Sequence, residues 1–279
     1  MHRISLPIPF WKMSGAGNDF IIIDHRQPLI PQDLMAEFAR RVCRRKFSAG
    51  ADGLFLIEPS EKVDFKWRFF NADGSEAEMC GNGARCVARF AYMHGIAAAR
   101  MRFETLAGVI DATVADTQAT IRMPSPHSFR FDRQVEVGGH LVMVHSVDTG
   151  VPHAVVFVDD IETVDVVGLG RELRNHPVFA PAGTNVDFIG QTVEGFRIRT
   201  YERGVEDETL ACGTGVVAGA LIAAAKGMAG SPVAMVTAGG IALTVQFAGT
   251  KGGEVDHVVL KGPAHLVYKG ELTGEALLD

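Results

Sequence analysis

Two segments of this chain repeat one pattern of residues, and this repeat constrains the fold more than any other feature. They run from Arg68 to Gly83 and from Thr200 to Gly215, and they align on Cys80 and Cys212 without a gap. Each has a β-prone start, a polar loop with a Glu four residues before the Cys, and Cys-Gly-X-Gly opening an apolar helix. Each predicted helix ends at a glycine fifteen residues after its cysteine, at Gly95 and Gly227. The repeat predicts an internal duplication.

The length supports this interpretation, because 279 residues exceed what one hydrophobic core usually serves. Pro124-Ser-Pro126 marks the expected boundary between the copies. Each half shows several mostly antiparallel strands around one prominent helix, which predicts two α+β domains facing each other across a cleft. Ligands often bind at such interfaces. The predicted elements include helices over 33–45, 80–94 and 166–175, one from residue 212 onward, and strands over 53–58, 65–70 and 254–261.

Composition excludes several classes of protein. Hydrophobic and charged contents of 47% and 22% are globular values, and a net charge of −6 argues against a nucleic-acid partner. No apolar run is long enough to span a membrane, and the start has no signal-peptide core. Four cysteines make no disulfide framework, so a cytoplasmic location is expected. No pair of cysteines or histidines has the spacing typical of a zinc site. The basic cluster over 40–46 lies at the end of a predicted helix, where cations interact favourably with the carbonyl end of the helix dipole.

The two repeated cysteines have a favourable place for chemistry. A thiolate at a helix N-terminus is stabilised by unpaired N–H groups and by the helix dipole. The same N–H groups suit a carboxylate, and the flanking glycines allow close approach. Two such helix starts could hold the carboxylate of one substrate while one thiolate removes a proton from the adjacent carbon and the opposite thiol returns one. Opposed thiols therefore favour racemisation or epimerisation. Cys43 and Cys86 lack the repeated pattern and are interpreted as buried small hydrophobes.

Five motifs carry a resemblance to a known family. They are Gly15-Ala-Gly-Asn-Asp-Phe, Asn71 through Arg85, Gly150-Val-Pro-His-Ala-Val, Gly183-Thr-Asn-Val, and Glu202-Arg-Gly through Cys212-Gly-Thr-Gly. With them the chain resembles, over nearly its whole length, the diaminopimelate epimerases of bacterial lysine and peptidoglycan synthesis. The resemblance implies two domains, residues 1–124 plus 266–279 and residues 125–265, each a strand barrel around a central helix with the active site in the cleft between them. It also implies a homodimer, no cofactor and no metal.

Residue by residue, the resemblance implies that Cys80 and Cys212 are the base and acid pair. His153 and Glu202 would tune a nearby thiol, and Glu202 could also bind an ammonium group. The remaining positions would bind substrate, and they are Asn18, Asn71, Gly81, Asn82, Asn185, Arg203, Gly213 and Thr214. Of these, Arg203 would bind the distal carboxylate of the substrate. Taken alone, several have plainer interpretations: turn residues for Asn71 and Asn185, a surface pair for Glu202 and Arg203, and a core histidine for His153.

The chain departs from the family pattern at three places. Val151 replaces a frequent Asn, the loop after Glu202-Arg203-Gly204 is one residue longer than usual, and Gly53 replaces a Gln found in some members. Alternatives also remain. A histidine or proline racemase would share the thiols, although Asn82 stands where proline racemases favour His. A thiol redox protein would use Cys80 and Cys212 as a switch. An inactive carbohydrate- or peptide-binding module would use neither of these two cysteines.

Overall fold

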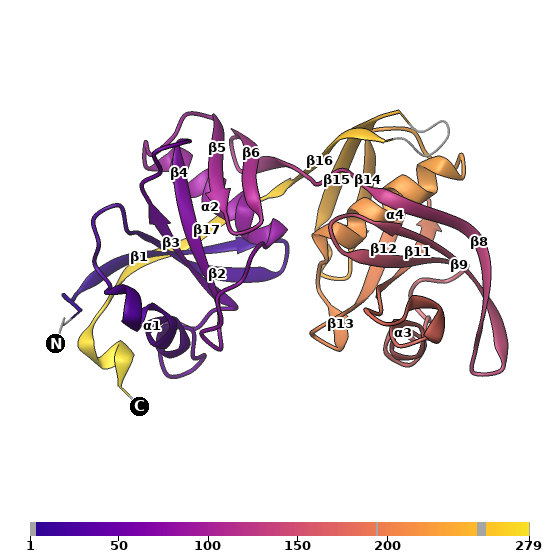
Figure 1. Ribbon diagram of the computed structural model, residues 1–279, viewed down its shortest axis with the longest axis horizontal. Helices are drawn as coiled ribbons and strands as arrows, with labels where there is room; N and C mark the ends of the chain where they lie inside the picture. The colour runs from indigo at the N-terminus through magenta and orange to yellow at the C-terminus, as the bar shows by residue number, and fades with distance from the viewer. Residues whose placement is uncertain (1–3, 194, 250–254, 279) are drawn as a thin grey trace. The chain divides into compact units, whose positions relative to one another are not determined.

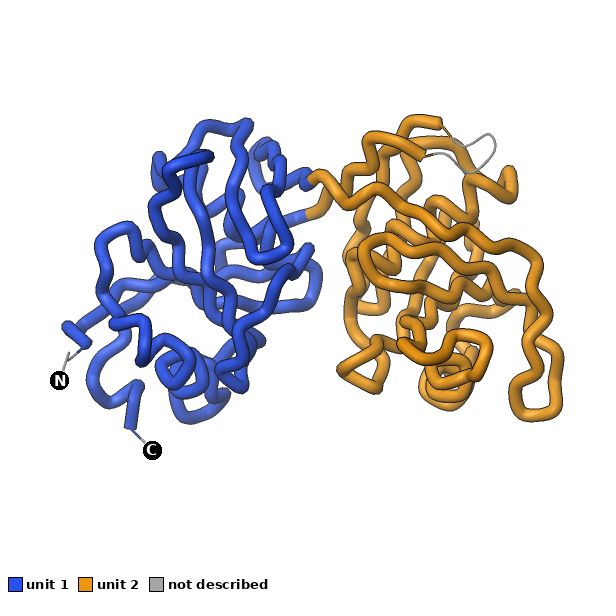
Figure 2. The backbone as a smooth tube through the Cα atoms, in the orientation of Figure 1, with its two compact units in different colours: residues 1–121, 263–279 blue, residues 122–262 orange. Residues whose placement is uncertain are grey.

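The computed structural model describes residues 4–193, 195–249 and 255–278. The chain forms two compact units, residues 1–121 with 263–279 and residues 122–262 (Figure 2). We call them unit 1 and unit 2. The domain limits taken from the sequence, at 124/125 and 265/266, stay a prediction, as does the cleft between the domains.

In unit 1 the strands follow one order across the sheet, β17-β1-β2-β3-β4-β5-β6-β7. The pairs β2–β3 and β4–β5 are parallel, and the other neighbours are antiparallel. The bounds are β1 Ile8–Gly15, β2 Asn18–Asp24, β3 Gly53–Glu58, β4 Phe65–Asn71, β5 Arg100–Thr105, β6 Gly108–Ala115, β7 Gln118–Arg122 and β17 His265–Leu272.

Unit 2 repeats this order and these directions strand by strand, as β8-β9-β10-β11-β12-β14-β15-β16 with β10–β11 and β12–β14 parallel. The bounds are β8 His127–Val137, β9 His140–Asp148, β10 Pro152–Val158, β11 Asn185–Thr192, β12 Gly195–Glu202, β14 Val233–Thr237, β15 Ala242–Ala248 and β16 Asp256–Pro263, with the short β13 Asp207–Thr209 beside β12.

The matching strand order confirms the predicted α+β class and the internal duplication. The edge strands are β17 and β7 in unit 1 and β8 and β16 in unit 2. Among the described residues the two edge strands of the same unit do not pair with each other, so the strands of each unit form a barrel-like sheet that is not closed. The predicted strand over 254–261 is present as β16, although residue 254 lies outside the described residues.

Four helices of the described chain make the crossovers that parallel strands require. They are α1 Met35–Val42, α2 Gly81–Met93, α3 Val166–Arg174 and α4 Gly213–Ala225 (Figure 1), with short 3-10 turns at Gln32–Leu34, Pro177–Phe179 and Gly274–Leu277. The predicted helix over 33–45 was too long. It ends at Val42 because the carbonyls of Val42 and Cys43 bond the N–H groups of Gly50 and Ala51 instead of a further turn.

α2 and α4 are the central helices that the repeat predicted. α2 packs on β1, β2 and β6, and α4 packs on β9, β10, β11, β12, β14 and β15. α4 is apolar around its whole circumference, as expected of a buried helix. Both helices end as predicted, in a Schellman motif: the N–H groups of Gly95 and Ile96 bond the carbonyls of Tyr92 and Ala91, and those of Gly227 and Met228 repeat the arrangement.

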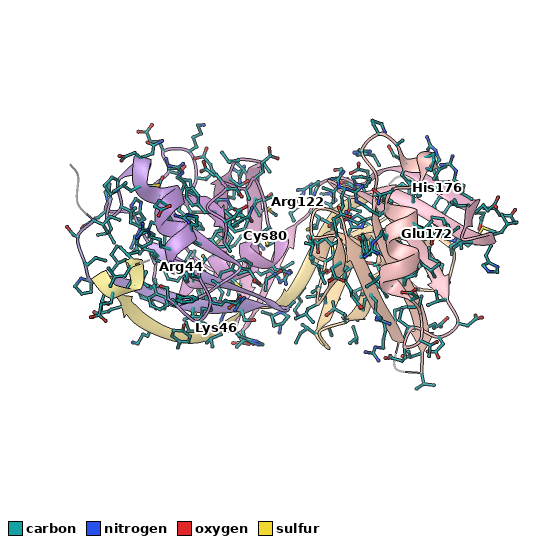
Figure 3. The ribbon with its side chains drawn as sticks, turned by 90° about the horizontal axis from the view of Figure 1, so that it is seen from below. Arg44, Lys46, Cys80, Arg122, Glu172 and His176 are labelled. Carbon is teal, nitrogen blue, oxygen red and sulfur yellow. The ribbon has the colours of Figure 1, made fainter. Side chains whose placement is uncertain are left out.

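The basic cluster, Arg40, Arg41, Arg44, Arg45 and Lys46, lies at and after the end of α1 (Arg44 and Lys46 are labelled in Figure 3). Arg40 and Arg41 pair with Glu37, and Arg45 pairs with Asp19 and Asp52. These ion pairs and the carbonyl end of α1 neutralise much of the cluster, in agreement with its structural interpretation.

Candidate functional site

Each repeated cysteine is the N-cap of its central helix. Cys80 precedes α2 in extended conformation, and its sulfur accepts a hydrogen bond from the Gly83 N–H at 3.4 Å (Cys80 is labelled in Figure 3). Cys212 precedes α4 in a similar backbone conformation, and its sulfur lies 3.4 Å from the Thr214 hydroxyl. The first N–H groups of a helix have no partner within the helix. Each unit therefore places a sulfur beside an anion-binding helix start.

The two glycines of each Cys-Gly-X-Gly serve different purposes. A Cβ on Gly83 would lie 2.2 Å from the Phe55 ring, and one on Gly215 would lie 2.3 Å from Asp187 Oδ1. These distances are far inside van der Waals contact, so the second glycine is required by packing on β3 or β11. A Cβ on Gly81 would meet only Ile121, at 3.8 Å. Of these three glycines, only Gly81 keeps open space.

The strand register corrects the gapless alignment of the repeats. Phe55 of β3 faces Phe69 of β4, and Asp187 of β11 faces Thr200 of β12. Phe69 stands eleven residues before Cys80, whereas Thr200 stands twelve before Cys212. The loop of unit 2 is therefore one residue longer than its counterpart in unit 1.

A chain of hydrogen bonds fixes two predicted site residues of unit 1. Arg85 Nη2 donates to Asn82 Oδ1 at 2.8 Å, Asn82 Nδ2 donates to Asn18 Oδ1 at 2.7 Å, and Asn18 Nδ2 donates to Asp52 Oδ2 at 2.9 Å. Asn18 follows the two-residue turn of Ala16 and Gly17, both with positive φ, that joins β1 to β2. The structure thus brings Asn18 and Asn82 together at the start of α2.

Asn71, the other predicted amide of unit 1, forms its hydrogen bonds with a different residue, Ser75. Its side chain donates to the Ser75 hydroxyl at 3.0 Å, and its backbone N–H bonds the Ser75 carbonyl. Asn71 therefore shapes the turn after β4, and its side chain does not join the chain of Arg85, Asn82 and Asn18. This bond agrees with the plainer interpretation of Asn71 as a turn residue.

Arg85 is a residue that the sequence interpretation missed. It is fully buried in α2, and among the described residues no carboxylate pairs with it. Burial lowers the pKa of this guanidinium, while the thiols of Cys86 and Cys80 act in the opposite direction. A buried cation one turn inside α2 favours negative charge at Cys80. A single Arg within the apolar run from Ala84 to Ala88 was the available signal.

The predicted residues of unit 2 are held by backbone groups. Asn185 donates to the Pro152 carbonyl at 3.1 Å and accepts the Arg203 N–H at 2.8 Å. The Arg203 guanidinium donates to the Ala182 carbonyl at 3.2 Å. Asn185 therefore positions the backbone of Arg203, and the side chain of Arg203 stays half-exposed.

The surroundings of Cys212 are buried and acidic. Burial is the main cause that raises the pKa of Cys212 well above 9.0, and the charges of Glu202 and Asp187 act in the same direction. Burial also raises the pKa of Glu202. Thr214 moderates the effect through its hydroxyl, and its carbonyl accepts from Thr149 at 3.2 Å. Burial and the acidic neighbours thus disfavour the thiolate form of Cys212.

Behind Cys212 lies a buried polar group of three side chains, His153, Asp187 and Thr200. His153 Nδ1 lies 2.7 Å from Asp187 Oδ2, and the Thr200 hydroxyl donates to Asp187 Oδ1 at 2.7 Å. We call these three residues the polar trio. Asp187 and Thr200 were not recognised in the sequence, because an acidic or hydroxyl residue inside a β-strand pattern carries no local sign of its partners.

The two other cysteines are buried, as predicted. Burial raises the pKa of Cys43 and of Cys86 to about 12 in each case. All four cysteines are free. These two thiols are therefore packing groups.

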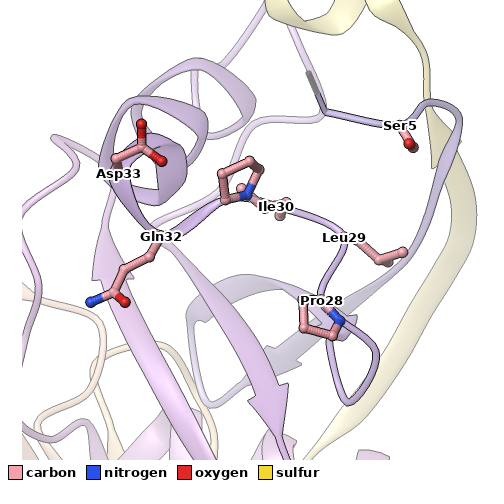
Figure 4. Close-up of a pocket in the computed structure, with 7 residues that line it drawn as sticks. Ser5, Pro28, Leu29, Ile30, Gln32 and Asp33 are labelled. Atoms are coloured by element: carbon pink, nitrogen blue, oxygen red, sulfur yellow. The ribbon is translucent and has the colours of Figure 1, made fainter. Parts of the chain in front are cut away.

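Three surface hollows in the described part of the structure are lined by neither Cys80 nor Cys212. One of 480 Å³ is lined by Ser5 and residues 28–33 (Figure 4). Its only ionisable side chain is Asp33, so it offers no converging charge. Within the described residues no group of His, Cys, Asp and Glu could hold a metal ion, and no helix is long and apolar enough to cross a membrane.

Comparison with known proteins identifies relatives of this chain. A family model described as diaminopimelate epimerase matches residues 10–128 and 145–267. The diaminopimelate epimerase of Aquifex aeolicus (strain VF5) is 44% identical over 279 residues, covering 96% of this chain and 99% of that protein. The protein of the same name from Hydrogenobaculum sp. (strain Y04AAS1) is 44% identical over 277 residues, covering 95% and 98%.

Among solved structures, a phenazine biosynthesis protein of the PhzF family from Bacillus anthracis superposes with a TM-score of 0.75 and covers 96% of this chain and 99% of its own. Its sequence identity is 14%, so this likeness shows the fold alone. The family model and the two relatives, by contrast, match at the level of sequence over almost the full length. The chain belongs to the diaminopimelate epimerase family.

Proposed function

We propose that this protein interconverts LL- and meso-diaminopimelate with Cys80 and Cys212 as the two acid–base groups, as a step of lysine and peptidoglycan precursor synthesis. The observation that carries the proposal is the duplicated helix start, in which each unit presents a cysteine as the N-cap of its central helix. Membership in the diaminopimelate epimerase family gives the substrate.

The proposed reaction starts with the two thiols in opposite protonation states. The buried cation of Arg85 would favour a thiolate at Cys80, whereas burial with Glu202 and Asp187 raises the pKa of Cys212 and would favour a thiol there. In the proposed reaction the Cys80 thiolate takes the proton from the α-carbon, and the Cys212 thiol gives its proton to the opposite face. The carbon is inverted, and each sulfur ends in the state of the other. Proton exchange with solvent then restores the starting states.

The substrate carboxylate at the reacting carbon would bind the N–H groups of both helix starts. Gly81 and Asn82 contribute in unit 1, and Gly213 and Thr214 contribute in unit 2. These N–H groups stabilise the negative charge that moves onto the carboxylate as the proton leaves, an effect of roughly 3 to 4 kcal/mol for one well-placed donor. Open space at Gly81 and the fixed amide of Asn82 support this assignment.

The remaining contacts recognise the rest of the substrate. Arg203 would bind the distal carboxylate, because its guanidinium is half-exposed and uses one donor on Ala182. Asn18 and Asn185 would contribute amide contacts, and Asn71 would do so from its turn. Glu202 would bind an ammonium group or tune the Cys212 thiol. His153 would activate that thiol.

Three further properties belong to this proposal: no pyridoxal phosphate or metal takes part, the protein acts in the cytoplasm, and it forms a homodimer. The thiols supply both proton-transfer groups, so no electron sink is needed beyond the bound carboxylate. The free cysteines suit a reducing compartment. Light scattering of the purified protein measures its mass against the 30.0 kDa of one chain.

The decisive experiment follows LL-diaminopimelate in deuterated water with protein that has been dialysed and treated with a chelator. The meso isomer should appear with one deuterium on the inverted carbon. Cys80→Ser and Cys212→Ser should each lower turnover by about a thousandfold or more, since an alcohol is a poor acid and base near neutral pH. Dependence on added cofactor, or near-normal turnover in either variant, would overturn the mechanism.

Cys86→Ser is the matched control, because Cys86 lies in the same helix as Cys80 and is a packing group. It should keep near-normal turnover per folded molecule. A panel of lysine, histidine and proline tests specificity in the same assay. Racemisation of histidine or proline at the rate of diaminopimelate epimerisation would favour the broader racemase alternative.

A further inference from the structure

The polar trio behind Cys212 is unusual because all three of its side chains are buried. The side chains of His153 and Asp187 have no exposed surface, and Thr200 is 3% exposed. Removing a carboxylate and an imidazole from water costs several kcal/mol unless their polar atoms are paired. A group of this kind therefore needs a reason beyond stability.

Unit 1 shows that the fold does not need polar residues there. By strand register, Phe20 of β2 corresponds to His153, Phe55 of β3 to Asp187, and Phe69 of β4 to Thr200. The three phenylalanines pack together, with Phe55 and Phe69 stacked at 4.4 Å between ring centres and Phe20 edge-on to Phe55 at 5.2 Å. The same three places in the same fold thus hold an apolar cluster behind Cys80 and the polar trio behind Cys212.

The hydrogen bonds of the polar trio place a proton on Nδ1 of His153. A carboxylate can only accept hydrogen bonds. Asp187 receives the Thr200 hydroxyl on Oδ1, so the 2.7 Å contact on Oδ2 is a bond donated by Nδ1–H of His153. The ring then turns its other nitrogen, Nε2, away from Asp187. Nε2 is buried and has no hydrogen-bond partner in the described protein.

Cys212 lies beside this group. Asp187 Oδ1 is so close to Gly215, in the first turn of α4, that a Cβ there would lie 2.3 Å from it. Asp187 and Glu202 both act on the Cys212 thiol through their charge, and His153 acts on Glu202 in the same way. The absence of a side chain at Gly215 thus admits the carboxylate next to the residue that caps the helix.

We propose that Asp187 is a positioning residue for the reaction: through its bond to Nδ1–H it fixes the orientation of the buried His153 ring, and it holds its carboxylate beside the first turn of the helix that Cys212 caps. This rests on the proposed function. As Cys212 gives up and regains its proton, the carboxylate and the oriented imidazole keep a fixed arrangement of charge beside it. Cys80 has no such group, because the counterpart residues in unit 1 are phenylalanines, and its buried charged neighbour is Arg85.

The test combines kinetics with the protonation state of the ring. Asp187→Asn removes the negative charge at nearly constant volume and should lower kcat by about a hundredfold, with KM within about threefold, because a general acid–base contribution is lost. Thr200→Val is the matched control: it removes the other hydrogen bond to the carboxylate but leaves the bond to His153. Its kcat should fall by less than about tenfold, because the bond that orients the His153 ring stays in place. An equal loss in both variants would assign the effect to packing and overturn the proposal.

The second measurement uses nitrogen NMR of the labelled full chain, with His153→Gln to identify the ring among the ten histidines. His153 in the wild type should carry a proton on Nδ1. A ring protonated on Nε2 alone would overturn the proposal, and this holds even if Asp187→Asn fails to fold. The ring state is measured without turnover, so it is independent of whether diaminopimelate is the substrate. An inactive wild type with Nδ1 protonated would refute the proposed function and leave the role of Asp187 in orienting the ring.

Discussion

The two glycines of Cys80-Gly81-Asn82-Gly83 allow a test that separates packing from chemistry. In Gly83→Ala the added methyl carbon would lie 2.2 and 2.7 Å from two carbons of the Phe55 ring. Comfortable carbon–carbon contact begins near 3.5 Å, so the ring or the helix must move by more than about 1 Å. Phe55 is fully buried, stacks on Phe69 and contacts Phe20, so it has no room to move.

Overpacking of this kind costs about 3 kcal/mol at the upper end of its usual range, and the helix gains about 1 kcal/mol when Ala replaces Gly. Gly83→Ala should therefore lose about 2 kcal/mol of stability, which corresponds to a fall in Tm of roughly 4 to 8 °C for a unit of this size. Calorimetry and urea unfolding of the full chain measure both quantities.

Gly81→Ala is the matched control, two residues earlier in the same turn. Its methyl carbon would meet only Ile121 at 3.8 Å, so stability should stay at or slightly above the wild type. Its activity should fall, because the methyl group would enter the space proposed for the substrate carboxylate. If Gly83→Ala unfolds at the wild-type temperature, or Gly81→Ala is the less stable variant, the assignment of these two glycines is wrong.

Three further predictions concern thiols and charge. With pKa values of about 12 instead of 9.0, Cys43 and Cys86 hold about a thousandfold less thiolate at pH 8, so mass spectrometry after brief alkylation should find Cys80 labelled and these two unlabelled. Because folding raises the pKa values of Cys43 and Cys86, the contribution of these two thiols to stability is fully present below pH 9 and is lost as pH rises toward 12. The urea concentration at the unfolding midpoint should therefore fall across that pH range. It should fall less steeply in a Cys43→Ala, Cys86→Ala double variant. Arg85→Met should slow alkylation of Cys80 at pH 8 by about tenfold, since the buried cation that favours its thiolate is gone; an unchanged rate would show that Arg85 acts only through Asn82.

Much of the fold follows from local patterns in the sequence. The cysteine caps, the apolar helices and the closing glycines at Gly95 and Gly227 are each specified within one turn of helix, and the structure has all of them. The repeat was equally visible because it lies in contiguous residues. The predicted end of the helix over 33–45 was wrong because that end is not specified by neighbouring residues. Its end at Val42 depends on hydrogen bonds to Gly50 and Ala51 in the following loop.

Local sequence patterns specified the duplication and the thiol at the start of each central helix, because caps and periodicity are properties of neighbouring residues. What lies behind each thiol depends on the folded arrangement of the strands. His153 and Asp187 are 34 residues apart, and Asp187 and Thr200 are 13 apart, so their meeting depends on the register of three strands. The same register brings Phe20, Phe55 and Phe69 together in the other unit. Two similar local motifs thus acquire unlike surroundings, one with a buried cation and the other with a buried imidazole and carboxylate, because side chains distant in sequence meet only when the sheet forms.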